Sequence, residues 1–267
     1  MAIHPTAIID SNAQLDTDVH VGPYAIIESG VRLSAGVVVG SHAVIKGETH
    51  IGANCRIHPH AVIGGDPQDM KYAGEQTKLE IGEGNTFREF CTVNRGTIQG
   101  HGITSIGNHN LFMAYSHVAH DCVVGNHCVM ANSANLAGHV LLQDRVVLGG
   151  LVGVHQRTRI GRCSMVGGGG MVAQDVPPFT IAQGDRARLY GLNIVGLRRN
   201  QFGLDTVGAL KSAYRELFHH GMPLRIALEQ VREGYQNFAE VRELVEFIEG
   251  STRGICRSTG TEQAQEP

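Results

Sequence analysis

Residues 3–63 read IHPTAI IDSNAQ LDTDVH VGPYAI IESGVR LSAGVV VGSHAV IKGETH IGANCR IHPHAV I, so that every sixth residue from Ile3 to Ile63 is aliphatic. The same apolar phase returns over residues 81–93 and runs again from Ile106 to Val172. A period of six fits neither an amphipathic helix nor a half-buried strand, which repeats every two residues. It is typical of a hexapeptide β-helix, in which three hexads form one triangular coil of about 18 residues. The sequence therefore predicts an all-β solenoid over residues 1–186, with the aliphatic side chains inside.

Stacking of the coils at the strand spacing of roughly 4.8 Å places residues 18 apart above one another. This register gathers polar residues from three neighbouring coils into two columns: His120 with Gly138 and Gln156, and Asp121 with His139 and Arg157, while His155 lies one place away. Histidine exchanges protons readily near neutral pH, and an adjacent carboxylate can orient its ring. We interpret the columns as a candidate active site. The alternative is that they are turn residues that satisfy corner backbone groups, which is the interpretation we prefer for His4, His42, His50 and His58.

Two polar excursions interrupt the hexads, over residues 64–80 and 94–105. Long loops on a rigid scaffold tend to carry function. The first excursion contains Asp69 and Lys71, an acceptor and a cation that could reach a bound substrate. The alternative is that each excursion is a tolerated insertion.

The composition bounds the class of protein. The chain has 267 residues, of which 42% are hydrophobic, enough for a substantial core. Its formal net charge of −3 argues against broad binding of nucleic acid. No basic leader is present and no apolar stretch approaches the ~18 residues of a membrane span, so we expect a cytoplasmic protein. Six cysteines without a C-x-x-C pair predict neither a disulfide framework nor a zinc knuckle. Cys122 and Cys128 occupy the same place in successive hexads and are expected to be small packing residues.

The hexads end at Asp175-Val176-Pro177-Pro178, and residues 187–255 are expected to form a small helical domain. Helical spacing of apolar residues begins at Leu204 and ends near Gly221, and further helices are expected from Pro223 and over residues 238–248. Residues 186–215 carry six basic residues and one acidic residue, which suits either a solvated helix face or an anionic partner. Residues 256–267 are expected to form a disordered tail.

Six segments, in this order, closely resemble the acyl-carrier-protein-dependent UDP-N-acetylglucosamine O-acyltransferases that begin lipid A synthesis: residues 68–75 (QDMKYAGE), 117–122 (HVAHDC), 137–140 (AGHV), 154–156 (VHQ), 173–178 (AQDVPP) and 191–194 (GLNI). The resemblance spans nearly the whole chain. It implies a left-handed parallel β-helix and a homotrimer with active sites in clefts between subunits. It also implies direct transfer of an (R)-3-hydroxyacyl group from acyl carrier protein to the glucosamine 3-hydroxyl of UDP-N-acetylglucosamine. No metal and no cofactor is implied beyond the phosphopantetheine arm that carries the donor.

The resemblance also implies residue roles. His120 would be the general base that removes the proton from the attacking hydroxyl, a role that typically contributes ~10²–10⁴ in rate. Asp121 would orient the imidazole, and the backbone N–H of Gly138 would stabilise the oxyanion. Asp69 and His139 match positions that hold the sugar nucleotide. Residues that match positions contacting substrate phosphates, the uridine end or the acyl-pantetheine arm are Lys71, His117, His155, Gln156, Asn193, Arg198 and Arg199.

Three positions bear on the choice of substrate. Gly168 occupies the place that limits acyl length in the family, and because glycine leaves the groove open we expect a longer 3-hydroxyacyl chain to fit. Arg186 and Val195 stand where better-known relatives carry histidine and glutamate, which leaves the donor and uridine contacts open.

Other classes of protein share parts of this pattern. A hexapeptide carbonic anhydrase-like protein would use histidines as zinc ligands across a subunit interface and would retain stoichiometric zinc. A purely structural solenoid needs no aligned His, Asp and Gly, and would not respond to loss of His120. The related sugar-nucleotide N-acyltransferase carries an extra uridine-binding domain ahead of its coils, whereas here the hexads begin at Ile3, so the O-acyl interpretation is preferred.

Overall fold

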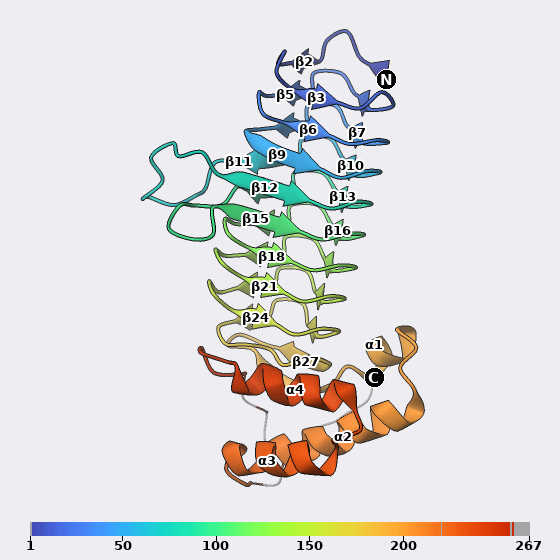
Figure 1. The fold of residues 1–267 in the computed structure, drawn as a ribbon, viewed down its shortest axis with the longest axis vertical. Coiled ribbons are helices and arrows are strands. Elements are labelled where there is room, and N and C mark those ends of the chain that lie inside the picture. Colours follow the sequence, from blue (N-terminus) through green and yellow to red (C-terminus); the bar gives the residue numbers. More distant parts are fainter. Residues whose placement is uncertain (1, 220, 257, 259–267) are drawn as a thin grey trace.

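The computed structural model describes residues 2–219, 221–256 and 258, and shows a long three-sided solenoid with a helical module at its C-terminal end (Figure 1). Three sheets form the sides of the solenoid. Sheet A contains β1 (Ala2–Ile3), β4 (His20–Val21), β7 (Val38–Val39), β10 (Arg56–Ile57), β13 (Thr86–Phe87), β16 (Leu111–Phe112), β19 (Val129–Met130), β22 (Val147–Leu148), β25 (Met165–Val166), β27 (Thr180–Gln183) and β28 (Arg188–Leu192). Sheet B contains β2 (Ile8–Ile9), β5 (Ile26–Ile27), β8 (Val44–Ile45), β11 (Val62–Gly65), β14 (Thr92–Asn94), β17 (His117–Val118), β20 (Asn135–Leu136), β23 (Gly153–Val154) and β26 (Met171–Val172). Sheet C contains β3 (Gln14–Leu15), β6 (Arg32–Leu33), β9 (Glu48–Ile51), β12 (Lys78–Ile81), β15 (Ile103–Ile106), β18 (Val123–Val124), β21 (Leu141–Leu142) and β24 (Arg159–Ile160).

The hexad residues line the inside of the solenoid. In most strands of two residues the second residue is buried; Val118 and Leu136, for example, are at most 1% exposed. Parallel pairing sets Val118 against Leu136 and Leu136 against Val154. The predicted spacing of 18 residues between neighbouring coils is therefore confirmed, and so is the alignment of the columns that follow these strands.

From Tyr24 onward, most corners contain a residue in the left-handed backbone region. At the corners that concern us these residues are Asp121, His139 and Arg157, with φ of 59°, 61° and 62°. A side chain in this region costs roughly 1 kcal/mol. Backbone hydrogen bonds between successive coils offset the cost, because the His139 N–H donates to the His120 carbonyl at 3.0 Å and the Arg157 N–H to the Gly138 carbonyl at 3.0 Å.

The solenoid is left-handed. In Figure 1 the strands of sheet C, which face the viewer, run to the right while the chain descends from its N-terminus. This hand opposes the right-handed crossover that most parallel strands adopt. Here the connections between successive strands are corners of a few residues rather than helices, so the packing of a crossover helix on the sheet, which sets the usual hand, does not apply.

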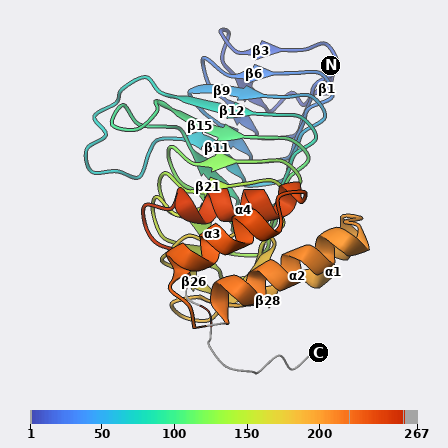
Figure 2. The same ribbon diagram turned by 60° about the horizontal axis from the view of Figure 1, so that its bottom comes forward.

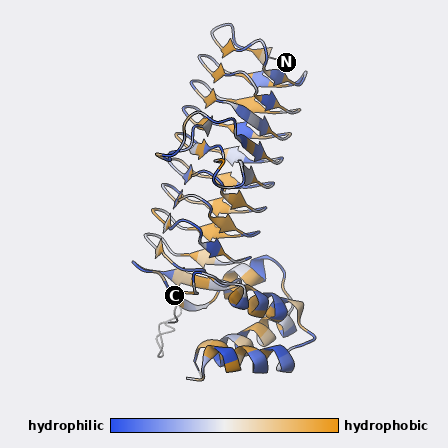
Figure 3. Cartoon of the chain, turned by 60° about the vertical axis from the view of Figure 1, so that its left-hand side comes forward, coloured by the Kyte–Doolittle hydropathy of each residue, from blue (hydrophilic) through white to orange (hydrophobic). Residues whose placement is uncertain are grey.

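Both excursions leave the solenoid at the corner between sheets B and C, the same corner that carries His120 and Asp121 (Figure 1). The first lies between β11 and β12, the second between β14 and β15. Strand pairing continues across both, since β14 pairs with β11 before it and β17 after it. Figure 3 shows that the excursions are mainly hydrophilic, whereas hydrophobic residues concentrate on the strands.

Below the last coil, β27 and β28 pair as an antiparallel hairpin, so that sheet A extends to Leu192, past the boundary at residue 186 predicted from the sequence. The hexad pattern has ended there, and backbone pairing alone defines the strand. The helices follow: α1 (Ile194–Arg199), α2 (Leu204–Phe218), α3 (Leu224–Gly234) and α4 (Ala239–Glu249) (Figure 2). The three longer ones match the predicted helices. The short α1 was not predicted; it begins where the Asn193 side chain accepts a hydrogen bond from the Gly196 N–H.

The helical module is joined to the last coil by arginines. Arg162 makes a bidentate contact with Glu243 of α4, with an Nη2 to Oε2 distance of 2.6 Å. Arg159 donates to the Phe247 carbonyl of the same helix at 2.8 Å. Most of the tail predicted over residues 256–267 lies outside the described residues, but Cys256 is buried and its N–H donates to the Asp175 carbonyl, so ordered chain continues past residue 255. No helix in the described ranges is long and apolar enough to cross a membrane.

Candidate active site

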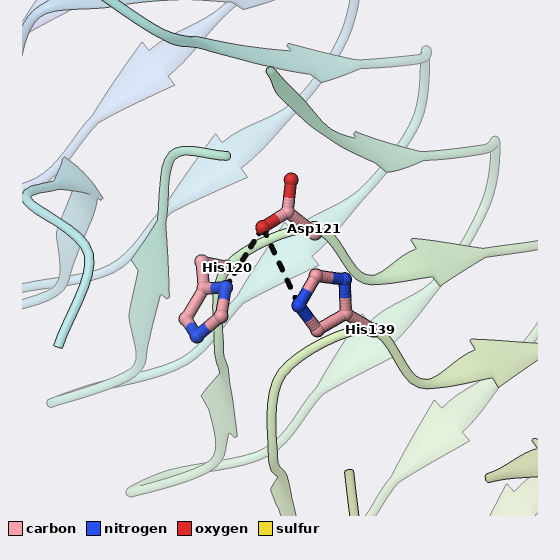
Figure 4. A group of neighbouring side chains, drawn as sticks. All are labelled: His120, Asp121 and His139. Atoms are coloured by element: carbon pink, nitrogen blue, oxygen red, sulfur yellow. Dashed lines mark hydrogen bonds and ion pairs between the residues drawn. The ribbon is translucent and has the colours of Figure 1, made fainter. Parts of the chain in front are cut away.

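His120, Asp121 and His139 meet at the corner between sheets B and C (Figure 4). The His120 Nδ1 lies 2.8 Å from Asp121 Oδ2, and the His139 Nε2 lies 3.9 Å from the same oxygen. The two rings meet edge to face, with centroids 5.1 Å apart. The Asp121 side chain is fully buried, while those of His120 and His139 are 13% and 16% exposed. The structure thus joins residues that the 18-residue register placed in neighbouring columns.

Asp121 is a buried carboxylate with several donors. Its Oδ1 accepts the N–H groups of Thr97 at 3.1 Å and His101 at 3.0 Å, and its Oδ2 accepts the Thr97 hydroxyl at 2.6 Å. Burial on its own would raise the pKa of Asp121, but the hydrogen bonds from Thr97, His120 and His101 hold the pKa below its ordinary value. The carboxylate is therefore charged at neutral pH, and the His120 Nδ1–H donates to it.

The hydrogen bond to Asp121 determines which ring nitrogen of His120 can accept a proton. With Nδ1 protonated and held by Asp121, the lone pair lies on Nε2, which has no hydrogen-bond partner among the residues that the structure describes. A ring in this tautomer, oriented by a buried carboxylate, is arranged to accept a proton from a substrate hydroxyl.

Gly138 lies against the His120 ring. A Cβ at this position would come within 2.6 Å of His120 Cε1 and 2.7 Å of Nε2, so only glycine fits without moving the ring. Its carbonyl accepts the Arg157 N–H, whereas its own N–H donates to no group in the described part of the chain. A buried donor without a partner beside an imidazole that could accept a proton is the arrangement expected of an oxyanion site.

Two further histidines of the site are neutral. His117 lies on β17, with its Nδ1 2.7 Å from the Thr92 hydroxyl. Burial, followed by the nearby His120, lowers the pKa of His117. Burial also lowers the pKa of His139, although Asp121 opposes the shift. Neutral imidazoles both donate and accept hydrogen bonds, which suits contacts with sugar hydroxyls.

Cys122, next to the pair, is a packing residue as predicted. It is fully buried, and burial raises the pKa of its thiol to about 12. A thiol in this state is a poor nucleophile. Cys128, at the same place in the next hexad, has the same burial and the same rise in pKa to about 12.

Among the described residues, none of the other predicted side chains makes a hydrogen bond or ion pair with His120. On the first excursion Asp69 accepts the Lys71 N–H at 3.0 Å, and the Lys71 side chain is exposed. His155 and Gln156 are exposed at the corner after β23. Asn193 is buried. Its Nδ2 donates to the Cys163 carbonyl at 2.9 Å, and its oxygen caps α1. Arg198 and Arg199 are exposed at the end of α1.

Gly168 lies at a pocket of about 430 Å³ near the end of the solenoid. Arg186 and Arg188 line the same pocket. A Cβ at Gly168 would have the Gly150 carbonyl oxygen as its nearest neighbour, at 3.4 Å, so a side chain could be added here in ordinary van der Waals contact. Arg186, one of the two departures from the family pattern, thus stands beside the residue expected to limit acyl length.

Sequence reasoning missed the residues that surround Asp121. Thr97 and His101 belong to the second excursion, where the register of 18 residues is interrupted.

Hydrogen bonds to Asp121 also limit how well His120, Asp121 and His139 could bind a metal ion. The ligand atoms of His120, Asp121 and His139 lie within 4.8 Å of one another, but a cation at Asp121 Oδ2 would have to displace hydrogen bonds from Thr97 and His120.

The coils and their corner site define a class, the hexapeptide-repeat transferases. The model for the bacterial transferase hexapeptide matches residues 31–65 and 103–138, and the model for domain 2 of UDP-N-acetylglucosamine O-acyltransferase matches residues 175–256. The acyl-[acyl-carrier-protein]--UDP-N-acetylglucosamine O-acyltransferase of Burkholderia lata is 52% identical over 96% of this chain and 99% of that protein. The protein of the same name from Xylella fastidiosa is 50% identical over 96% of this chain and 97% of its own length.

Solved structures agree. The UDP-N-acetylglucosamine O-acyltransferase of Moraxella catarrhalis superposes with a TM-score of 0.93 at 44% identity, covering 96% of this chain and 100% of that one. The UDP-N-acetylglucosamine acyltransferase of Campylobacter jejuni gives 0.90 at 39% identity, covering 96% and 99%. The chain belongs to the UDP-N-acetylglucosamine O-acyltransferase family.

Proposed function

We propose that this protein transfers an (R)-3-hydroxyacyl group from acyl carrier protein to the glucosamine 3-hydroxyl of UDP-N-acetylglucosamine, the first step of lipid A synthesis. The observation that carries the proposal is the oriented pair of His120 and Asp121 beside the unpartnered N–H of Gly138. Relatives that are about 50% identical to this chain over almost their full length are named as acyl-[acyl-carrier-protein]--UDP-N-acetylglucosamine O-acyltransferases.

In the proposed mechanism the Nε2 of His120 removes the proton of the 3-hydroxyl as its oxygen attacks the thioester carbonyl. The C–O bond forms, and the carbonyl oxygen becomes an oxyanion that the Gly138 N–H stabilises. Collapse of this intermediate breaks the C–S bond. The phosphopantetheine thiolate leaves and takes the proton from His120, which returns the base to its starting state. Asp121 remains ionised and holds the imidazolium in place.

The proposed reaction uses no metal and no further cofactor. The thioester is already activated, and the attack of the hydroxyl needs only one proton acceptor, which is His120. Asp69, Lys71 and His139 are proposed to hold the sugar nucleotide. Gly168 is proposed to border the acyl groove, and the absence of a side chain at the edge of its pocket favours a longer 3-hydroxyacyl chain. His117, His155, Gln156, Asn193, Arg198 and Arg199 are proposed to complete the contacts to phosphates, uridine and the donor arm.

We also propose a homotrimer with active sites between subunits. Within one chain, Gly168 lies at the corner between sheets A and B, after β25, whereas His120 lies at the corner between sheets B and C, after β17. Sites that draw on both regions would therefore need a neighbouring copy. The proposed location is the cytoplasm, which six buried cysteines with free thiols support.

The test is transfer from (R)-3-hydroxyacyl carrier protein to UDP-N-acetylglucosamine, with the product identified by mass spectrometry and NMR. The proposal predicts a single ester on the 3-hydroxyl, formed at the same rate with and without a chelator. Absence of ester would reject the proposal, and loss of transfer with the chelator would show that a metal takes part in the reaction. An amide formed only from an amino sugar nucleotide would identify an N-acyltransferase, which the family membership disfavours.

A further inference from the structure

The second excursion supplies most of the hydrogen bonds to Asp121. Thr97 is 1% exposed, and its hydroxyl donates to Asp121 Oδ2 at 2.6 Å, the shortest of these contacts. The Thr97 N–H lies 3.1 Å from Oδ1 and 3.2 Å from Oδ2, and the His101 N–H donates to Oδ1. Between them, Gly100 passes so close that a Cβ there would lie 2.3 Å from Asp121 Cγ. The loop therefore wraps around the carboxylate and excludes water from it.

This loop is anchored from its base. Arg95 is 7% exposed and donates to Asp66 Oδ1 at 2.5 Å and to the Tyr72 hydroxyl at 3.1 Å, both on the first excursion. Its other guanidinium nitrogen donates to the Gly64 carbonyl. The Arg95 N–H also donates to the Gly65 carbonyl at 3.0 Å. Arg95, two residues before Thr97, is therefore held by both its side chain and its backbone. These contacts restrict where the Thr97 hydroxyl can lie.

The Thr97 hydroxyl and His120 share one oxygen. Asp121 Oδ2 accepts both the Thr97 Oγ1–H and the His120 Nδ1–H. A hydroxyl that donates to this oxygen withdraws part of its charge and limits how far the carboxylate can rotate. Both effects reach the imidazole through Asp121.

We propose that Thr97 is a positioning residue of the reaction: its hydroxyl holds Asp121 in the orientation that aims His120 at the substrate hydroxyl, and it moderates how strongly His120 retains a proton. This inference rests on the proposed function. Thr97 touches neither the reacting atoms nor His120. The ionisable groups that face the pair from other elements are His117 on β17, His101 on the second excursion, and His139 and Arg157 on the next corners.

The matched variants are Thr97→Val and Thr97→Ser. Valine keeps the branched shape and the backbone N–H bonds but removes the hydroxyl donor, whereas serine keeps the donor and removes a methyl group. If Thr97 only fills space, serine is the more damaging change. If the Thr97 hydroxyl positions Asp121, valine is the more damaging change.

The first measurement is the pH profile of kcat/KM, with kcat and both KM values at neutral pH. For Thr97→Val we expect kcat to fall roughly tenfold with KM changed less than about twofold. The acid limb should move to higher pH, because Asp121 gains charge density and stabilises the imidazolium. Thr97→Ser should stay within about threefold of the unsubstituted protein. A Thr97→Val enzyme with unchanged kcat and unchanged acid limb, or equal losses in the two variants, would overturn the inference.

A second measurement does not require activity. NMR of protein with ¹⁵N-labelled histidine follows the titration of the His120 ring, identified by its loss in His120→Gln. We expect its midpoint to rise in Thr97→Val and to stay in Thr97→Ser. An unchanged midpoint in Thr97→Val rejects the inference even if the protein transfers no acyl group, whereas an inactive unsubstituted protein with a shifted midpoint rejects only the proposed function.

Discussion

In the second coil the corner between sheets B and C is formed by residues 28–31, and in the coil of His120 the same corner is formed by residues 119–122. Gly30 and Asp121 occupy equivalent places, and both have positive φ. In the second coil the corner is open: Glu28 is 42% exposed and meets Lys46 at 3.7 Å. Asp121 is fully buried, because the second excursion covers it. The hexads thus provide the backbone of the site, and the excursion provides the burial that gives its residues their chemistry.

The largest effect expected from this difference concerns the buried carboxylate. Asp121→Asn should lower kcat by roughly 10²–10⁴, because an amide can no longer hold His120 in the tautomer that leaves Nε2 as the acceptor. Asp10→Asn is the matched control, since Asp10 lies at the uncovered corner between the same sheets and is exposed. The measurement is steady-state acyl transfer by both variants. Equal rates in the two variants would show that burial of the corner carries no catalytic role.

A second way to test the comparison is to add one methyl group at each of two corners. Gly138→Ala should lower kcat by roughly 10², because its Cβ would displace the His120 ring, and a shift of about 1 Å can cost this much. Gly150→Ala should be nearly neutral, because its Cβ would meet only the Asn132 carbonyl, at 3.5 Å. Melting temperatures of both variants separate a loss of fold from a loss of alignment. A fully active Gly138→Ala enzyme would contradict the tight contact with His120.

A third effect concerns acyl selectivity. Gly168→Met should shift the preferred donor to a shorter 3-hydroxyacyl chain by roughly tenfold or more, because the new side chain fills the space that a longer chain would use. Competition between donors of different length, read out by mass spectrometry of the product, measures the shift. A strict preference of the unsubstituted protein for a short chain would refute the role of Gly168.

The smallest effect is on stability against pH. The pKa values of His117 and His139 are lowered in the folded state, first by burial. Below the ordinary histidine value of about 6.5 the unfolded chain therefore binds more protons than the folded one, and stability falls as pH falls. His117→Gln should reduce the difference in unfolding free energy between pH 7 and pH 5, measured in urea. His42→Gln, at an exposed corner, is measured alongside as the control.

How far the sequence predicts this molecule depends on where the period holds. Residues 118, 136 and 154 keep the period, so the pairing of their strands and the alignment of His120 with Gly138 followed from counting. Thr97 and His101 interrupt the period, and no periodic signal could bring them to Asp121. The left-handed turn followed from the resemblance and not from the period, because the general crossover preference favours the opposite hand.

The end of the chain shows the same limit. Helices α2, α3 and α4 have enough residues for an apolar periodicity, and they were predicted. The hairpin of β27 and β28 and the six residues of α1 are too short for one, and their positions depend on backbone pairing and on the Asn193 cap.

The most direct test of the account compares a covered histidine with an uncovered one. The His120 side chain is 13% exposed and is bonded to the covered Asp121, whereas His42 is exposed at a corner, stacked between Tyr24 and His60. His120→Ala and His42→Ala are assayed for transfer of a 3-hydroxyacyl group to UDP-N-acetylglucosamine at equal concentrations of folded protein. We predict a loss of roughly 10²–10⁴ for His120→Ala and a rate within about twofold of the unsubstituted protein for His42→Ala. A His120→Ala protein that keeps its rate would contradict the assignment of the base.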